Sequence, residues 1–344
     1  MVTLVEVARR AGVTAATVSN VLRNRGRVGA ETRARVLAAV EALGYRPNLT
    51  ARALVEGYAP MVALVVSSIA NPFYPEFALA VEQALRRNGQ YLIVCNTNAD
   101  VREGRTYLDQ IAGTLAEGVL VASADIDPDD LERARSRGVP VVVCMWERPS
   151  DPPGKLPCVA IDFRLAGRLA AEHLLELGHR RIGIIVGASA QDGVHKERFA
   201  GFVDALAAMR VSALAVECTT DSIAGGEYAV HRLLGAHPDL TAIFATNDLP
   251  AIGAMHAALD MGRRVPDDLS LIGITDISLA KQVRPALSTV AIPLEEAAAL
   301  AVELLKAQRT DERGKVLEDV PLHARLRITT PPRLIVRGST KAPR

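Results

Sequence analysis

Nine arginines and four glutamates, with no lysine, aspartate or histidine, stand in the first 57 residues of this 344-residue chain. This segment therefore carries a formal charge of +5, whereas the whole chain carries +1. Neutralising phosphates with such cations supplies most of the non-specific affinity of proteins for DNA. A small basic module on a mildly acidic body is typical of a DNA-binding protein, although an ordinary solvated basic surface has the same charge.

The arginines must be positioned by short helices. Residues 3–6 (TLVE) fit a capping box, with a hydroxyl at the N-cap and a carboxylate three residues later. We expect the helix that follows to turn Val5 and Ala8 inward and to end near Gly12, because glycine readily adopts the positive φ of a tight turn.

Two further helices are predicted after this turn. Thr14 can cap a second helix that contains Val18 and Leu22. Val36, Leu37, Val40 and Leu43 lie at helical spacing and predict a third helix over about 30–43, ending at a glycine. Short helices joined by a glycine-containing turn form a helix-turn-helix, whose second helix meets base edges in the major groove.

Patterns that would indicate an enzyme or a membrane protein are not found. The sequence contains no P-loop, no G-x-S-x-G and no dinucleotide fingerprint, and its histidines lack metal-ligand spacing. Its apolar runs are too short for a membrane span, and the N-terminus has no signal-peptide pattern. We therefore expect no cofactor, no metal and no membrane partner, and a cytoplasmic, nucleoid-associated location. The scattered cysteines are predicted to be buried and reduced: Cys95, Cys144, Cys158 and Cys218.

From residue 61 onwards, apolar runs alternate with amphipathic segments, in two successive sets. Repeated βα units of this length indicate parallel, doubly wound sheets. We expect an α/β fold with two Rossmann-like lobes and a cleft between them. The predicted strands are 62–66, 91–95, 118–121, 139–144, 158–161, 182–186, 214–216, 242–245 and 269–274. The predicted helices are 75–88, 102–112, 128–137, 164–177, one after His195, 224–234 and 248–261.

Four segments carry a specific resemblance. Residues 2–8 (VTLVEVA), 11–14 (AGVT), 16–22 (ATVSNVL) and 44–48 (GYRPN) closely resemble the headpiece of the lactose-repressor family of bacterial transcription regulators. The resemblance extends from residue 2 to about 340. It implies a homodimer that binds a near-palindromic DNA operator and is controlled by a small-molecule effector in the cleft.

The resemblance also implies a domain organisation. The headpiece would occupy 1–47, a hinge helix 48–57, and a core similar to periplasmic sugar-binding proteins 58–344. Crossings between the lobes are expected near 160, 290 and 320, so that lobe 1 comprises about 61–160 and 291–320 and lobe 2 about 161–290 and 321–338. A helix over 295–307 would return to lobe 1, and residues 333–337 would return to lobe 2.

DNA-contacting positions follow from the same resemblance. Ala15 and Ala16 occupy the places that most directly meet bases, and Asn20 could bond an adenine edge. In the family, a leucine of the hinge wedges into the minor groove, and Leu54 matches it, although packing against the core is the alternative. The implied DNA contacts are Thr3, Thr14, Ala15, Ala16, Thr17, Ser19, Asn20, Arg23, Tyr45, Asn48, Ala51 and Leu54.

Effector contacts are expected where strands end at the cleft. Arg198 and the pair Asn247-Asp248 match effector-binding positions of the family, with a surface salt bridge and helix capping as the respective alternatives. Phe73, Tyr74 and the single tryptophan could form apolar walls or could simply pack in the core. The implied effector contacts are Phe73, Tyr74, Trp146, Arg198, Asn247, Asp248, Thr275 and Asp276.

Two departures from the family bear on the effector. Met145 and Thr275 stand where the family commonly has carboxylates that bind effector hydroxyls. We therefore expect a glycoside, a sugar acid or a non-sugar metabolite rather than a free monosaccharide. The alternative classes, an enzyme or a periplasmic-type receptor on the same lobes, would need a catalytic constellation in the cleft or a signal peptide without a headpiece.

Overall fold

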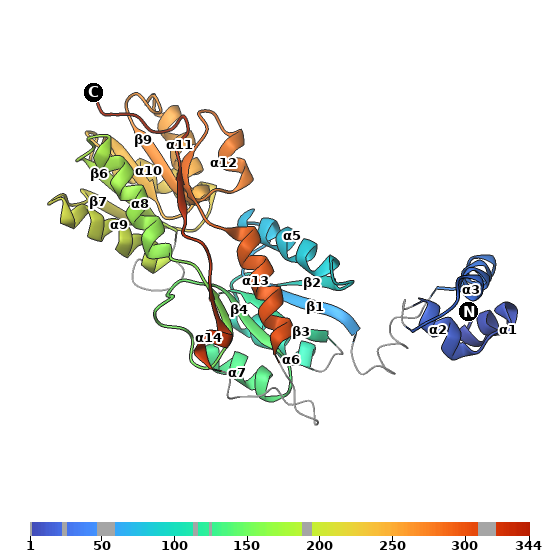
Figure 1. Ribbon diagram of the computed structural model, residues 1–344. Helices are drawn as coiled ribbons and strands as arrows, with labels where there is room; N and C mark the ends of the chain where they lie inside the picture. The colour runs from blue at the N-terminus through green and yellow to red at the C-terminus, as the bar shows by residue number, and fades with distance from the viewer. Residues whose placement is uncertain are drawn as a thin grey trace. The chain divides into compact units, whose positions relative to one another are not determined.

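The computed structural model describes residues 2–22, 26–46, 59–112, 116–123, 126–187, 195–308 and 321–344 (Figure 1). The chain divides into two compact units, Met1–Ala59 and Pro60–Arg344. The expected hinge, residues 48–57, lies outside the described residues. The two units are considered separately below.

The first unit consists of helices α1 (Leu4–Ala11), α2 (Ala15–Leu22) and α3 (Ala30–Leu43), as the sequence predicts. Its small core contains the fully buried Val7, Val18 and Val36. The prediction that Ala8 points inward is confirmed, but the same prediction for Val5 is wrong, because Val5 is 59% exposed. In each helix the neighbouring apolar positions are sufficient to fill the small core.

The second unit is built on two six-stranded sheets. The first has the order β11-β5-β4-β3-β1-β2, and it forms lobe 1. Its strands are β1 (Ala59–Val66), β2 (Tyr91–Asn96), β3 (Ala116–Ala122), β4 (Val141–Trp146), β5 (Cys158–Ala160) and β11 (Leu326–Ile328). Its helices are α5 (Phe73–Arg86), α6 (Val101–Ala112), α7 (Pro128–Ser136), α13 (Leu294–Ala307) and α14 (Leu322–Arg325). Val62–Val66 is almost completely buried, as expected of a strand covered on both faces.

The second sheet, in lobe 2, has the order β12-β10-β9-β8-β6-β7. Its strands are β6 (Ile182–Val186), β7 (Ala215–Cys218), β8 (Ala242–Ala245), β9 (Ser270–Thr275), β10 (Ser288–Ala291) and β12 (Arg333–Ile335). Its helices are α8 (Phe163–Glu176), α9 (Lys196–Ala208), α10 (Ile223–Ala236), α11 (Asp248–Asp260) and α12 (Ser278–Gln282). Only β12 runs antiparallel to its partner among the described pairings.

The chain crosses between the lobes three times, and Figure 1 shows these crossings side by side. The first two fall after β5 and after β10, near the expected positions. The third falls between Ile328 and Arg333, later than the expected residue 320, because β11 pairs in parallel with β5 of the first sheet. β12 then pairs with β10 of the second sheet, so residues 333–335 return to lobe 2 as predicted.

A close helix contact in lobe 2 fixes the position of α9. A Cβ atom added to Gly167 of α8 would lie 1.9 Å from the carbonyl oxygen of Arg198, and one added to Gly201 of α9 would lie 1.9 Å from that of Arg164. The two glycines therefore allow the backbones of α8 and α9 to touch. This contact sets where Arg198 enters the space between the lobes.

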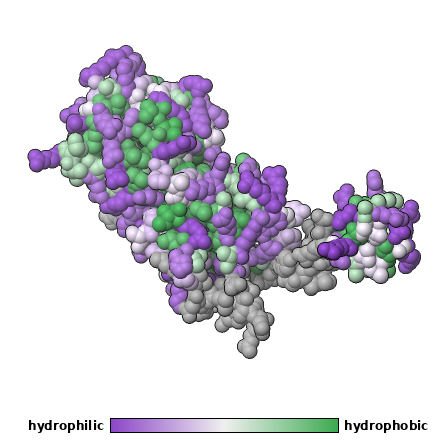
Figure 2. Space-filling model, in the orientation of Figure 1, coloured by the Kyte–Doolittle hydropathy of each residue, from purple (hydrophilic) through white to green (hydrophobic). Residues whose placement is uncertain are grey.

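Three of the four cysteines are buried, and the surface is mostly hydrophilic. Cys95, Cys144 and Cys158 are free and buried as predicted, but Cys218 is exposed, because it ends the edge strand β7. The face in Figure 2 is mostly hydrophilic, with hydrophobic residues gathered in separate patches on the two lobes. None of the described helices combines the length and apolar character needed to cross a lipid bilayer.

Candidate functional site

The predicted capping and turn chemistry of the first unit is present. The Thr3 hydroxyl accepts a hydrogen bond from the Glu6 amide, and the Glu6 carboxylate accepts one from the Thr3 amide. These bonds lower the pKa of Glu6. Gly12 adopts φ +64° between α1 and α2. The Thr14 hydroxyl accepts from the Thr17 amide and so caps α2.

The start of α2 presents small and polar side chains to solvent. Thr14, Ala16 and Asn20 are exposed, while Ala15, Thr17 and Ser19 are partly buried. Thr3 is exposed, and Tyr45 packs partly against the small core. Such a surface allows close approach of a helix to base edges. Arg23, Asn48, Ala51 and Leu54 lie outside the described residues, so their predicted DNA contacts stay predictions.

A cavity of about 380 Å³ lies between the two lobes of the second unit. Six of the predicted effector contacts line it: Phe73, Tyr74, Trp146, Arg198, Asn247 and Thr275. Met145 also lines it. The cavity further includes polar residues that the sequence analysis did not single out: Glu147, His195, Lys196, Glu197 and Asp221.

Arg198 is the central cation of the cavity. Its side chain is only 5% exposed, and one terminal nitrogen donates to the Thr246 carbonyl oxygen at 3.1 Å. The other terminal nitrogen lies 3.6 Å from a Glu147 carboxylate oxygen. The guanidinium carbon lies 4.2 Å from the centre of the Phe163 ring, which is a cation–π geometry. These contacts hold the guanidinium group in one orientation.

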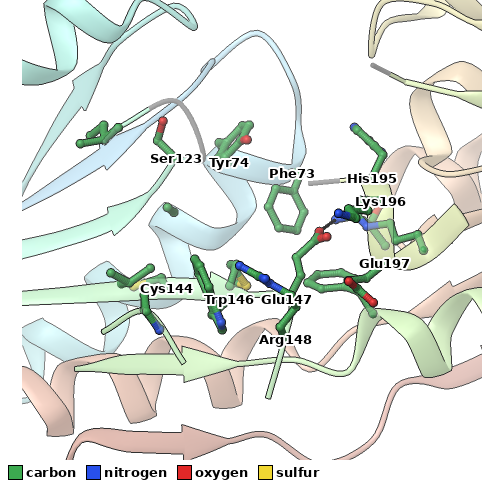
Figure 3. A pocket seen from close by; sticks show the side chains of 18 of the residues that line it. Phe73, Tyr74, Ser123, Cys144, Trp146, Glu147, Arg148, His195, Lys196 and Glu197 are labelled. Atoms are coloured by element: carbon green, nitrogen blue, oxygen red, sulfur yellow. Dashed lines mark ion pairs between the residues drawn. The ribbon is translucent and has the colours of Figure 1, made fainter. Parts of the chain in front are cut away.

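Glu147 enters the cavity because β4 is irregular at its end. The pairing of β4 with β5 shifts between Val143 and Trp146, and Met145 adopts φ +59°. Figure 3 shows Glu147 among the side chains that line the cavity, and its carboxyl group pairs with Arg198. Burial raises the pKa of Glu147 to about 8, and the Arg198 charge offsets this only in part. The neutral acid is therefore favoured when the cavity is empty.

Asp221 connects three segments around the cavity. One of its carboxylate oxygens accepts from the Asn71 side-chain amide at 2.9 Å and from that of Asn247 at 2.8 Å. Burial raises the pKa of Asp221 to about 6, opposed by Arg198 and by these two amides. Asn71 belongs to lobe 1, whereas Asp221 and Asn247 belong to lobe 2. The hydrogen bond from Asn71 therefore joins the lobes.

His195 lies beside this group. Its Nε2 atom is 3.9 Å from the Asp221 carboxylate, and its side chain is 2% exposed. Burial, together with the Arg198 charge, lowers the pKa of His195 to about 3. The imidazole is therefore neutral at physiological pH. It offers one donor nitrogen and one acceptor nitrogen.

Five buried polar atoms in the cavity have no hydrogen-bond partner among the described residues. They are both carboxylate oxygens of Glu147, Nδ1 of His195, Nε of Arg198 and Oδ1 of Asp221. Leaving one such atom unsatisfied typically costs about 1–3 kcal/mol. Their convergence in one cavity indicates a binding site for a polar ligand.

Asp248 and Asp276 are not among the residues that line the cavity. Asp248 is completely buried, where it accepts hydrogen bonds from the Thr289 hydroxyl and the Ile277 amide. Asp276 adopts φ +58° and pairs with Arg337. Both carboxylates brace the segment after β9. Asn247 caps α11, and it also accepts from the Thr275 hydroxyl at 3.1 Å.

Three cavity residues that the sequence analysis did not single out could have been found only from weak sequence patterns. Glu147 lies two positions after Met145, so strand alternation would place both side chains on one face, but the resemblance pointed only to Met145. Asp221 follows β7 and could have been found as an acidic residue at the carboxyl end of a strand. His195 precedes α9 directly. Among the described residues, no three His, Cys, Asp or Glu side chains gather closely enough to hold a metal ion.

A helix-turn-helix unit joined to a two-lobed core with a polar cavity defines a class of ligand-responsive DNA-binding regulators. Bacterial regulatory proteins of the lacI family match residues 3–48, and the periplasmic binding protein-like domain matches residues 171–340. The chain is 34% identical over 343 residues to the HTH-type transcriptional regulator DegA of Bacillus subtilis, with 98% of each chain covered. It therefore belongs to the lacI family of bacterial transcription regulators.

Other similar proteins have the same architecture. The HTH-type transcriptional regulator GalR of Escherichia coli is 34% identical over 309 residues, which is 89% of each chain. A LacI-family transcriptional regulator from Silicibacter pomeroyi has a TM-score of 0.77 at 29% identity, covering 99% of this chain and 100% of that one. The Lac repressor dimer bound to operator and the anti-inducer ONPF has a TM-score of 0.82 at 25% identity, covering 99% of each chain.

Proposed function

We propose that this protein is a homodimeric transcription regulator, acting mainly as a repressor, that binds a near-palindromic operator. An effector in the cavity would lower or raise its affinity for this operator. The proposal of a dimer on DNA is supported by the similar Lac repressor structure, which is a dimer bound to operator. One recognition helix in each headpiece suits a two-fold symmetric site. The cytoplasm, where bacterial DNA lies, is the proposed place of action.

The observation that carries the effector part of this proposal is the set of five unpaired buried atoms in the cavity. A similar solved structure is the transcriptional regulator CelR in complex with cellobiose, at 31% identity and a TM-score of 0.69. We infer that a small molecule likewise occupies the cavity of this chain. We assign no reaction to the site, because the named relatives are transcription regulators.

Contacts between the lobes provide a physical route for control. Glu147 of lobe 1 faces Arg198 of lobe 2, and Asn71 of lobe 1 bonds Asp221 of lobe 2. At the rim, the Glu76 carboxylate accepts hydrogen bonds from the amide and the hydroxyl of Ser278. A ligand that binds one arrangement of the lobes better than another shifts the equilibrium between them. Linkage then requires operator and effector to affect each other's affinity.

The test begins with mapping of the genomic DNA bound by the protein, followed by affinity measurements on the recovered sites. We expect a near-palindromic site and a complex of two chains per site by light scattering. The Asn20→Ala variant should lose discrimination at one base pair, by about 1–3 kcal/mol. A monomer bound to a single half-site would overturn the proposal, and uniform weakening on every site variant would place Asn20 against phosphate.

A further inference from the structure

Lobe 2 contacts the start of α5 at two separate points. In the cavity, the side-chain amide of Asn71 donates to Asp221 at 2.9 Å. At the rim, the amide and the hydroxyl of Ser278 donate to Glu76 at 2.9 and 2.6 Å. Asn71 lies just before α5 and Glu76 lies in its first turn, so both contacts hold the same end of one helix. On the lobe 2 side the two contacts come from different segments, one after β7 and the other after β9.

A continuous series of hydrogen bonds joins these two segments within lobe 2. Asp221 accepts from the Asn247 side-chain amide at 2.8 Å. The Thr275 hydroxyl lies within hydrogen-bond distance of both Asn247 Oδ1 and Asp248 Oδ2, at 3.1 and 3.3 Å. The same Asp248 oxygen accepts from the Ile277 amide at 3.0 Å, one residue before the rim contact. The series therefore runs from the cavity to the rim through the carboxylate of Asp248.

The segment that follows β9 has a backbone conformation that few residues adopt. Thr275 has φ +122° and Asp276 has φ +58°, which lie in the region that favours glycine. A β-branched residue there is strained, and such a conformation persists only where the surrounding structure holds it. Asp276 is held by an ion pair with Arg337, and Ile277 is held by Asp248. Without these contacts the segment would relax and the rim contact would be lost.

The Asp248 carboxylate fills a space that the neighbouring strands leave open. It is completely buried, and its second oxygen accepts from the Thr289 hydroxyl of β10 at 2.6 Å. A Cβ atom added to Gly273 of β9 would lie 2.3 Å from that oxygen, so glycine at this position makes room for the carboxylate. Asp248 does not line the cavity. Any effect that it has on a ligand must therefore pass through the segment that it holds.

We propose that Asp248 is a positioning residue that makes the two contacts between lobe 2 and α5 respond together, because it holds residues 275–278 in one conformation. This inference rests on the proposed effector function of the cavity. Thr275 lines the cavity, so a ligand that engages its hydroxyl alters the support of the segment and, through it, the bond between Ser278 and Glu76. Such coupling requires an element whose equilibrium both sites bias, and the strained segment is that element.

Hydrogen–deuterium exchange of the full-length, ligand-free protein tests the role of Asp248, with the Ile277 and Ser278 amides as the readout. Asp248→Ala should speed their exchange about 10-fold or more, the usual effect of losing a hydrogen bond to a charged group. Asp248→Asn should stay within about twofold of the parent, because asparagine can present its oxygen to Ile277 and its amide group to Thr289. Asp260→Asn, an exposed change at the end of α11, is the matched control. Exchange in β8 should stay as in the parent in all three variants.

Coupling of the two contacts is tested with Asn71→Asp. This change keeps the oxygen that accepts from the Phe73 amide but replaces the donor to Asp221 with an acceptor. It should speed exchange of the Ser278 amide about 10-fold. Thr275→Val removes the bridging hydroxyl at nearly constant shape; it should itself speed this exchange, and Asn71→Asp should then add less than about twofold. These two variants decide the question even where Asp248→Ala does not fold.

Three results would overturn the inference. Exchange that rises as much in β8 as at Ser278 would make Asp248 a general support of lobe 2. An equal effect of Asn71→Asp with and without the Thr275 hydroxyl would mean that the lobes separate as rigid bodies. Unchanged exchange at Ser278 in Asp248→Ala would remove Asp248 from the rim contact. Operator affinity is measured separately: a parent protein that binds no operator fails the proposed function, whereas the exchange experiment needs neither operator nor ligand.

Discussion

The two walls of the cavity are built in different ways. Lobe 2 contributes polar groups that other residues of the same lobe hold in place. α9 touches α8 through Gly167 and Gly201, and Asp248 accepts a hydrogen bond from the segment after β9. Lobe 1 contributes an apolar surface, with Asn71 and Glu147 as its polar contacts to the groups of lobe 2. Ligand recognition and closure of the lobes are therefore assigned to different parts of the molecule. Lobe 2 holds a fixed hydrogen-bonding pattern, while lobe 1 closes on it through few contacts.

The largest effect should come from disturbing the bracing of lobe 2. Gly167→Ala places a Cβ against the Arg198 carbonyl oxygen, so α9 must move and carry Arg198 with it. We expect a loss of about 3 kcal/mol in the free energy of unfolding, measured by urea denaturation. Gly235→Ala on α10 is the control, because no atom lies within 4 Å of the added Cβ. There alanine should be neutral or stabilising by up to about 1 kcal/mol. Equal effects of the two changes would disprove the bracing.

Removing the cation of lobe 2 should affect the ligand more than the fold. Arg198→Ala removes the guanidinium group that faces Glu147 and the unpaired Nε donor. Effector affinity should fall at least about 100-fold, while operator affinity without effector should stay within about twofold. Arg168→Ala is the control, since this arginine forms an ion pair with Glu172 on the exposed surface of α8. An effector response that survives in Arg198→Ala would contradict the assignment.

A smaller effect concerns the acid of lobe 1. Because the pKa of Glu147 is raised to about 8 in the fold, the stability contributed by its neutral form is complete at low pH and is lost as pH rises toward 8. The Arg198 and Arg148 charges lower the pKa of this carboxyl group and the Glu197 charge raises it, and together they do not cancel the effect of burial. Glu147→Gln stays neutral at every pH.

The ligand-free Glu147→Gln variant should therefore melt above the parent, and the difference in Tm should grow between pH 5 and pH 8. At pH 8 it should reach about 3 °C, which corresponds to roughly 1 kcal/mol for a unit of this size. Glu303→Gln, an exposed change on α13 measured over the same range by scanning calorimetry, should show no growing difference. A difference that shrinks with rising pH would mean that Glu147 is ionised in the empty cavity.

The smallest effect should come from the rim contact between the lobes. Glu76→Gln weakens the hydrogen bonds from Ser278, and the closed arrangement should lose about 1 kcal/mol. Effector affinity should then fall about fivefold. Glu82→Gln on the same helix is the matched control, because Glu82 pairs with Arg86 within α5. Equal titration curves for both variants would show that the rim contact plays no part in closure.

Much of the fold could be predicted from the sequence because its central strands are continuous apolar runs. β6 and β8 begin and end at the predicted residues, and α3 ends at the predicted glycine. β10 and β11 were missed for a physical reason. β11 is three residues long, and β10 contains Ser288 and Thr289, whose buried hydroxyl groups find partners in Thr340 and the Arg337 amide and in Asp248, respectively. Such partners come from distant parts of the chain.

The site was predicted less completely. Phe73, Arg198 and Asn247 line the cavity; Phe73 and Asn247 were placed because they follow strands, and Arg198 because it matches the family's effector-binding arginine. Strand alternation would place Glu147 on the same face as Met145, but β4 ends at Trp146 and Met145 adopts a left-handed conformation, so the rule does not fix the direction of the Glu147 side chain. Nothing in the residue type of methionine signals a positive φ. The Asp248 carboxylate was assigned to the ligand, although its partners, Thr289 and Ile277, lie far along the chain.

The late third crossing has a consequence for synthesis of the protein. The described helices of the small unit are made by residue 46, but β11 and β12, the edge strands of the two sheets, leave the ribosome after all the other described strands. Domains generally fold in the order in which they are translated. A nascent chain therefore has its DNA-binding unit long before either lobe is finished. A product truncated before Arg333 would keep that unit on a core with the edge of β10 uncovered, and so could occupy DNA while unable to respond to any ligand.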